Sequence, residues 1–274
     1  MAIRFRSIHC GHRSGDRALR IDREAAYRRP GCRCGEIAVG TALLALEIVA
    51  TSGACAQRAT RAGADRLEAC QALELGGLTP NPEALEQILE HRPPRGVHAL
   101  LRSRPGNFRY TTEEAALMER QAARLAAAGV DGIVLGALDP RGALDLAMMR
   151  PWAEAALAVN QRLEITVHRA IDASRDPIGE LARLLEFPAH RVLSSGGRRT
   201  VGQGMATIEA MVQAAGSRIE IMCGGGLQAT DIESVRRLGV AAVHSSAKTR
   251  YADTIEVSEQ QVRQLRCTLD ELEN

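Results

Sequence analysis

The chain has 274 residues and a formal net charge of only +2, from 35 basic and 33 acidic residues. This length suits one large α/β domain, and the balanced charge argues against a nucleic-acid partner. No apolar run reaches the roughly 18 residues of a membrane helix, and no secretory signal follows Met1, so we expect a cytoplasmic protein without membrane contact. Seven scattered cysteines, an odd number in a long chain, argue against a disulfide framework.

Residues 1–42 are predicted to form a basic, disordered extension that precedes a barrel domain at 43–274. Residues 1–38 contain nine arginines against four acidic residues and show no helical or strand period. The alternative is a metal-binding arm, because His9-Cys10-Gly11-His12 and Cys32-Arg33-Cys34 hold soft ligands close together. Neither spacing matches a standard zinc pattern, which favours the disordered extension.

Eight short apolar runs follow, each ending in a polar residue or a glycine, and most of the segments between them have a helical apolar period. In chain order the runs occupy residues 46–50, 66–70, 97–102, 132–136, 164–169, 191–197, 219–226 and 242–248. Eight strand–helix units in about 200 residues are typical of a parallel (β/α)8 fold, a TIM-like barrel. Because the chemistry of such barrels lies where the strands end, the strand ends are the places to examine for function.

Glycines separate several predicted helices from the strands that follow them. The first helix is predicted from about Cys55 to Ala62, and Gly63 suits the left-handed conformation just past a helix end. The same order of helix, glycine and strand recurs at Gly129 and Gly239. Repeated strand–helix units require right-handed crossovers and a parallel sheet. An open doubly wound sheet is the competing fold, and the absence of Gly-x-Gly-x-x-Gly after the first strand disfavours it.

Titratable side chains alternate along several predicted strands. Alternate strand residues share a face, so if these faces point inward the barrel mouth gathers Glu47, Glu68, Arg102, His168 and His244. Such groups are costly to bury unless they are paired or used. One interpretation is a functional site in which Glu47, Glu68 and His168 are acid/base residues; the alternative is a structural ion network with buried histidines.

Glycines and serines cluster at the ends of the last three strands. Glycine-rich turns and helix N-termini after strands seven and eight commonly hold phosphate in this fold. We therefore expect a small anion to contact the residues at these ends and their basic neighbours: Arg102, Arg169, Ser195, Gly224, Gly225, Gly226, His244, Ser245 and Ser246. The alternative is a set of tight turns with no ligand.

Several of these segments together resemble the CutC family. They are Glu47-Ile48, Gly63-Ala-Asp-Arg-Leu-Glu68, Gly76-Gly-Leu-Thr-Pro80, Val167-His-Arg-Ala170, Val192-Leu-Ser-Ser-Gly-Gly197, Ile219-Glu-Ile-Met-Cys-Gly-Gly-Gly226 and His244-Ser-Ser-Ala247. The resemblance covers residues 43–250. It implies a cytoplasmic, homo-oligomeric TIM-like barrel associated with copper homeostasis.

The family's proposed copper role is linked to cysteines at the ends of the first two strands. The second of these positions falls on Cys70, whereas the first falls on Val49, which cannot bind a metal. Cu(I) prefers two or more soft ligands, so the resemblance implies copper at Cys70 with another sulfur, for which Cys223 is the substitute. The alternative for Cys70 is a small buried apolar residue. Asn107 stands where the family carries an acid, which removes one negative charge at the mouth.

Three hypotheses follow from these residues. The first is a copper-homeostasis protein that binds Cu(I) through Cys70. The second is an enzyme acting on a small phosphorylated or sugar-like anion, with Glu47 or Glu68 and His168 transferring protons while Arg102 and Arg169 neutralise charge. The third is a regulatory or interaction module, because the fold alone does not choose a function.

Overall fold

The computed structural model describes residues 44–251 and 254–272. The predicted extension at 1–42, including the histidines and cysteines considered for a metal arm, lies outside the described residues. None of the described helices combines the length and apolar character that crossing a membrane requires.

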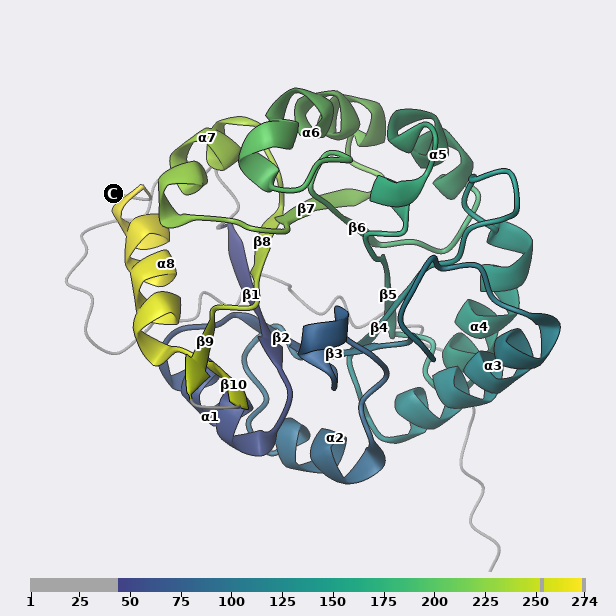
Figure 1. The fold of residues 1–274 in the computed structure, drawn as a ribbon, viewed down its shortest axis with the longest axis horizontal. Helices are drawn as coiled ribbons and strands as arrows, with labels where there is room; N and C mark the ends of the chain where they lie inside the picture. The colour runs from purple at the N-terminus through teal and green to yellow at the C-terminus, as the bar shows by residue number, and fades with distance from the viewer. Residues whose placement is uncertain (1–43, 252–253, 273–274) are drawn as a thin grey trace, which may run out of the picture. The chain divides into compact units, whose positions relative to one another are not determined.

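Eight parallel strands close into one barrel, which confirms the predicted fold (Figure 1). The strands are β1 (Ala45–Ala50), β2 (Arg66–Ala69), β3 (Val97–Leu100), β4 (Gly132–Leu135), β5 (Glu164–Val167), β6 (Arg191–Ser194), β7 (Glu220–Gly224) and β8 (Ala242–Ser245). Each strand pairs with the next, and β8 pairs with β1 to close the sheet.

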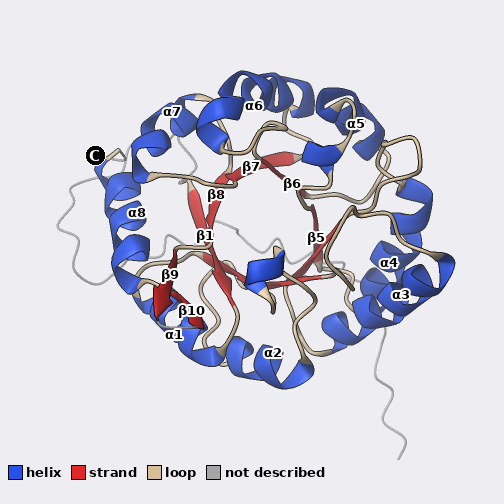
Figure 2. Ribbon diagram, viewed as in Figure 1, coloured by secondary structure: helices blue, strands red, loops and turns tan. Residues whose placement is uncertain are grey.

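Helices surround the strands as an outer ring (Figure 2). They are α1 (Gly53–Arg61), α2 (Pro82–Leu89), α3 (Thr112–Ala127), α4 (Leu146–Val159), α5 (Pro177–Leu184), α6 (Val201–Ala215), α7 (Ile232–Arg237) and α8 (Glu259–Glu271). Short 3-10 turns η1 (Leu73–Leu75), η2 (Ile171–Ala173) and η3 (Ala229–Asp231) follow β2, β5 and β7.

Local sequence explains where these helices begin and end. Helix α1 starts two residues earlier than predicted because the Ser52 hydroxyl accepts the Cys55 N–H at 3.2 Å and caps the helix. The three glycines predicted at helix ends, Gly63, Gly129 and Gly239, all have the expected positive φ, at 102°, 90° and 77°.

A small hairpin follows β8 that the sequence pattern did not predict. Within the apolar run at 242–248, β8 ends at Ser245, and Ala247 follows with a φ of +40°. Strands β9 (Lys248–Tyr251) and β10 (Thr254–Val257) then pair in an antiparallel manner. Lys248, the last residue of that apolar run, is the first residue of β9.

The two faces of the barrel differ in polarity. The outward face packs against the helices in one large apolar core that includes Leu46, Ile48 and Leu67. The inward face has two small apolar clusters, Ala45–Leu193–Met222–Ala242 and Val49–Cys70–Leu100–Val134. Charged residues on the same strands, such as Glu47 and Arg66, are buried inside the barrel beside these clusters.

Candidate functional site

The mouth of the barrel contains a cavity of about 830 Å³. Four of the five predicted mouth residues line it: Glu68, Arg102, His168 and His244. The fifth, Glu47, is completely buried and does not reach the cavity wall. Strand alternation therefore places these titratable groups inside the barrel, as predicted. Four of them line the cavity, and Glu47 lies in a layer beneath it.

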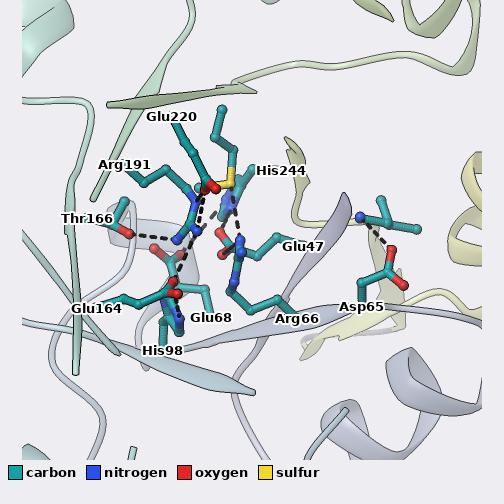
Figure 3. A network of polar contacts seen from close by, with 12 residues as sticks. Glu47, Asp65, Arg66, Glu68, His98, Glu164, Thr166, Arg191, Glu220 and His244 are labelled. Carbon is teal, nitrogen blue, oxygen red and sulfur yellow. Dashed lines mark hydrogen bonds and ion pairs between the residues drawn. The ribbon is translucent and has the colours of Figure 1, made fainter. Parts of the chain in front are cut away.

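Glu47, Glu68 and His244 converge from the adjacent strands β1, β2 and β8 (Figure 3). His244 Nδ1 lies 2.7 Å from Glu47 Oε1, and His244 Nε2 lies 3.9 Å from Glu68 Oε2. The second oxygen of Glu47 accepts a hydrogen bond from Arg66 Nη1 at 3.1 Å. Closure of the barrel between β8 and β1 brings together residues that are 197 positions apart.

The two carboxyl groups of this cluster have pKa values shifted in opposite directions. Burial would raise the pKa of Glu47, but the His244 hydrogen bond and the Arg66 charge outweigh it and hold that pKa far below its usual range. Burial, reinforced by Glu47 and opposed by His244, raises the pKa of Glu68 to about 7. Burial would lower the pKa of His244, but Glu68 and Glu47 raise it. Glu47 thus stays ionised, whereas Glu68 changes protonation near neutral pH.

His168 is held as a neutral hydrogen-bond donor. Its Nδ1 accepts the Ala170 N–H at 3.1 Å, so the ring proton lies on Nε2, which has no hydrogen-bond partner in the described chain. Burial and the charge of Arg102 lower the pKa of His168 to about 3. Among the described residues, no hydrogen bond or ion pair links His168 to Glu47 or Glu68. This geometry favours donation to a ligand over the proton transfer expected from the sequence.

Arg169 is fixed by a residue that the sequence analysis missed, Asp172. Arg169 Nε donates to Asp172 Oδ2 at 2.8 Å, and Nη2 donates to Ser195 Oγ at 2.8 Å. Asp172 also accepts the hydroxyl of Ser194 at 2.6 Å and the backbone N–H of Gly197 at 3.0 Å. The three-residue spacing of Arg169 and Asp172 was the available signal. Ser195 therefore supports Arg169 and does not line the cavity.

Arg102 is anchored to a loop. Its Nη1 donates to the carbonyl oxygens of Leu75 and Gly77 at 3.1 and 2.8 Å, and its guanidinium carbon lies 5.0 Å from the centre of the Phe108 ring. The Phe108 and His168 rings are in turn 5.0 Å apart between centroids. Arg102 therefore shapes the wall beside His168 as well as contributing charge.

The glycines and serines at the last strand ends make close contacts with site residues. A Cβ on Gly225 would lie 2.8 Å from Arg169 Nη1, and one on Gly224 would lie 2.9 Å from His244 Cβ. These two positions need glycine because the side chains of the site occupy the space. Gly225, Gly226, Ser245 and Ser246 line the cavity, whereas Gly224 does not.

The two cysteines considered for copper lie on opposite faces of the sheet. Cys70 packs inside the barrel with Val49, while Cys223 belongs to the core between the strands and the helices. Burial, with a contribution from Glu68, raises the pKa of the Cys70 thiol, and burial raises that of Cys223 to about 12. The structure thus does not bring Cys223 to Cys70, and the residue beside Cys70 is the valine at the family's first cysteine position.

At the end of the barrel opposite the mouth, the buried Arg191 forms a second set of polar contacts with two partly exposed carboxylates and a buried threonine (Figure 3). Its Nε donates to Glu220 at 2.8 Å, Nη2 to Glu164 at 3.0 Å, and Nη1 to Thr166 Oγ1 at 3.3 Å. We call Glu47, Arg66, Glu164, Arg191 and Glu220 the interior network. The structural alternative raised from the sequence is therefore realised in part, but around Arg191 and Glu220, which the sequence analysis did not single out.

Comparisons with known proteins agree on one family. The model of the CutC family matches residues 44–249. A family protein CutC from Xanthomonas campestris pv. campestris (strain 8004) is 40% identical over 206 residues, covering 75% of this chain and 84% of that protein. One from Xylella fastidiosa (strain Temecula1 / ATCC 700964) is 40% identical over 207 residues, covering 74% of this chain and 75% of that protein.

A solved structure is similar throughout the barrel. It is that of a candidate copper homeostasis protein CutC from Streptococcus agalactiae, with a TM-score of 0.67 and 28% identity. The match covers 74% of this chain and 99% of that one. The chain described here belongs to the CutC family, whose name is associated with copper homeostasis.

Proposed function

We propose that this chain acts in copper homeostasis by binding one copper ion at the barrel mouth, between Glu68 and His244. The role is the one in the name of the Streptococcus agalactiae relative. The name of that relative supports this role over the acid/base enzyme considered from the sequence.

One observation carries the proposal: Glu47, Glu68 and His244 each offer a ligand atom, and these atoms lie within 4.8 Å of one another. Metal bonds to imidazole nitrogen and carboxylate oxygen are about 2.0–2.2 Å long, so one ion can touch two atoms up to roughly 4.2 Å apart. His244 Nε2 and Glu68 Oε2 are separated by 3.9 Å, which satisfies this condition without backbone movement.

Glu47 is suited to orient His244. Because Glu47 is ionised, it accepts the His244 Nδ1–H, so the proton that copper displaces is the one on Nε2, whose lone pair then faces Glu68. Carboxylates commonly hold metal-binding histidines in this way. Arg66 in turn holds Glu47, so the orientation of the imidazole depends on the interior network.

The donor set favours Cu(II) over the Cu(I) expected from the sequence. Imidazole and carboxylate are harder ligands than thiolate, and Cu(II) binds such sites more tightly than other divalent first-row ions. Cys70 supplies one protonated thiol inside an apolar cluster, with Val49 in place of a second sulfur. We therefore assign Cys70 a packing role.

Isothermal titration of the full chain with Cu(II) tests the proposal. We expect one equivalent to bind, Glu68→Gln and His244→Gln to weaken binding at least tenfold, and Glu47→Gln to weaken it by about 10–100-fold. Cys70→Ser is the matched control and should leave Cu(II) affinity unchanged. Full affinity in Glu68→Gln, or its loss in Cys70→Ser, would contradict the assignment.

The cytoplasmic location and the homo-oligomer implied by the family resemblance are further proposals. Sedimentation of the full chain tests the second: a monomer at all accessible concentrations would contradict it.

A further inference from the structure

The mouth cavity is lined by more positive than negative charge. Of the described residues in its wall, Arg102, Arg169 and Lys248 are cationic, and Glu68 is the carboxylate. A cavity lined mainly by one sign of charge concentrates ligands of the opposite sign. The cationic side of this cavity is therefore suited to an anion, and copper at Glu68 and His244 leaves that side without a ligand.

A buried donor in the wall lacks an acceptor. His168 is 5% exposed and lines the cavity, yet its Nε2–H has no hydrogen-bond partner in the described chain. Buried polar groups in native proteins are nearly always hydrogen-bonded, and an unexplained one indicates a missing partner. The Nδ1 contact with Ala170 fixes which nitrogen carries the proton, so the missing partner is an acceptor.

Arg169 offers a fixed positive charge in the wall of the same cavity. Asp172 and Ser195 hold Nε and Nη2, and Nη2 also reaches the carbonyl oxygen of Arg198 at 3.3 Å. Nη1 makes no hydrogen bond within the described residues, and it lies against Gly225, where a Cβ would come within 2.8 Å. A guanidinium fixed in this way loses little side-chain freedom when an oxyanion binds.

We propose that the mouth cavity binds a small organic oxyanion, a carboxylate or a phosphate monoester, whose negative group contacts Arg169 and whose second acceptor oxygen takes the His168 Nε2–H. The proposal does not depend on copper, because neither residue belongs to the Glu68–His244 pair. It assigns the cavity a second ligand class and no catalytic step.

Binding can be measured by thermal unfolding of the metal-free full chain with citrate or inorganic phosphate, using NaCl at equal ionic strength as the reference. We expect saturable stabilisation by at least one of the two anions, and the anion that acts identifies the ligand as a carboxylate or a phosphate. No saturable response to either anion beyond that of NaCl would overturn the proposal.

Variants locate the binding residues. Arg169→Gln should weaken anion binding about tenfold or more, and His168→Leu should weaken it severalfold, whereas His168→Gln keeps a donor near the Nε2 position and should retain most of the affinity. Arg162→Gln is the matched control, because Arg162 is exposed and lies in a separate pocket beside Glu164. Unchanged binding in Arg169→Gln, or an equal loss in Arg162→Gln, would overturn the assignment.

The copper proposal and the anion proposal can be tested independently of each other. Glu68→Gln should lose copper and keep the anion response, while Arg169→Gln should lose the anion response and keep copper. A Glu68→Gln variant that loses anion binding as completely as Arg169→Gln would contradict the separation of the two sites.

Discussion

Arg191 in the interior network and Arg169 at the mouth are both held by ion pairs, but they differ in how completely their guanidinium groups are paired. In the interior, Arg191 uses all three of its nitrogens. Arg66 pairs with the fully buried Glu47 through Nη1, while its Nε has no hydrogen-bond partner within the described chain. At the mouth, Arg169 keeps one nitrogen without a hydrogen bond, and His168 keeps its Nε2–H, within the described chain. Complete pairing is typical of groups that hold structure, and incomplete pairing of groups that bind ligands.

This difference implies that substitutions in the two regions should have different effects. Interior changes should reduce the free energy of unfolding, because they leave a buried charge without its partner. Substitution of Arg169 should alter binding with little loss of stability, because its side chain is 39% exposed.

The largest expected effect is that of Arg66→Met. Removing this guanidinium leaves the Glu47 carboxylate buried, and breaking such a pair costs about 3–5 kcal/mol. Urea unfolding at pH 7 measures the loss. Arg66→Met/Glu47→Leu should recover part of it, whereas Arg169→Gln should cost much less than Arg66→Met. Equal losses in Arg66→Met and Arg169→Gln would remove the distinction between the two regions.

Acid should destabilise the protein through two buried histidines. Burial and Arg66 lower the pKa of His98 to about 3, and burial and Arg102 lower that of His168 to about 3. The unfolded chain protonates both near pH 6.5, so stability falls from about pH 6.5 toward pH 3, by about 1.4 kcal/mol per pH unit for each histidine at most.

The variant His98→Phe isolates the contribution of His98 to this pH dependence. Neither ring nitrogen of His98 has a hydrogen bond within the described chain, so phenylalanine loses no such contact there. The variant should lose stability less steeply between pH 6 and 4 than the unaltered protein. An identical slope would show that His98 does not stay neutral in the folded state.

Gly225→Ala should cost about 1–3 kcal/mol and should also weaken anion binding. Gly225 has a φ of +108°, and a Cβ there would press on Arg169 at 2.8 Å. Gly129→Ala is the matched control, because its φ is +90° but its Cβ would meet nothing within 4 Å. Chemical unfolding and citrate titration of both variants separate backbone strain, which both share, from displacement of Arg169. Equal effects on anion binding would contradict the contact.

Glu68→Gln should change how the stability of the protein depends on pH. A carboxyl group whose pKa rises to about 7 contributes stability that is present below about pH 4.5 and is lost as pH rises through 7. The free energy of unfolding of Glu68→Gln minus that of the unaltered protein should therefore be larger at pH 8 than at pH 5. The opposite trend in paired urea titrations would show that Glu68 is ionised when the protein folds.

The alternation of residues along each strand predicted both the fold and the composition of the mouth. A period of two places Glu68, His168 and His244 on the inner face, and the same rule places Cys223 on the outer face opposite Met222 and Gly224. We could have excluded Cys223 from the sequence on this ground.

Pairing across strands could not be predicted, because it depends on register and on closure. That His244 meets Glu47 follows from the β1–β8 register, and that Glu47 is buried under the cavity follows from its depth in the barrel. The proton position on His168 depends on a single backbone contact with Ala170. Ala247 has a positive φ just before the β9–β10 hairpin, and alanine has no intrinsic preference for that conformation.

The most direct test of the mouth as a ligand site is pulsed electron paramagnetic resonance of the full chain loaded with one equivalent of Cu(II). We expect nitrogen modulation from one imidazole, with no sulfur ligation, that disappears in His244→Gln and persists in His168→Gln. A spectrum with thiolate character, or an imidazole signal that survives in His244→Gln, would contradict the assignment of copper to Glu68 and His244.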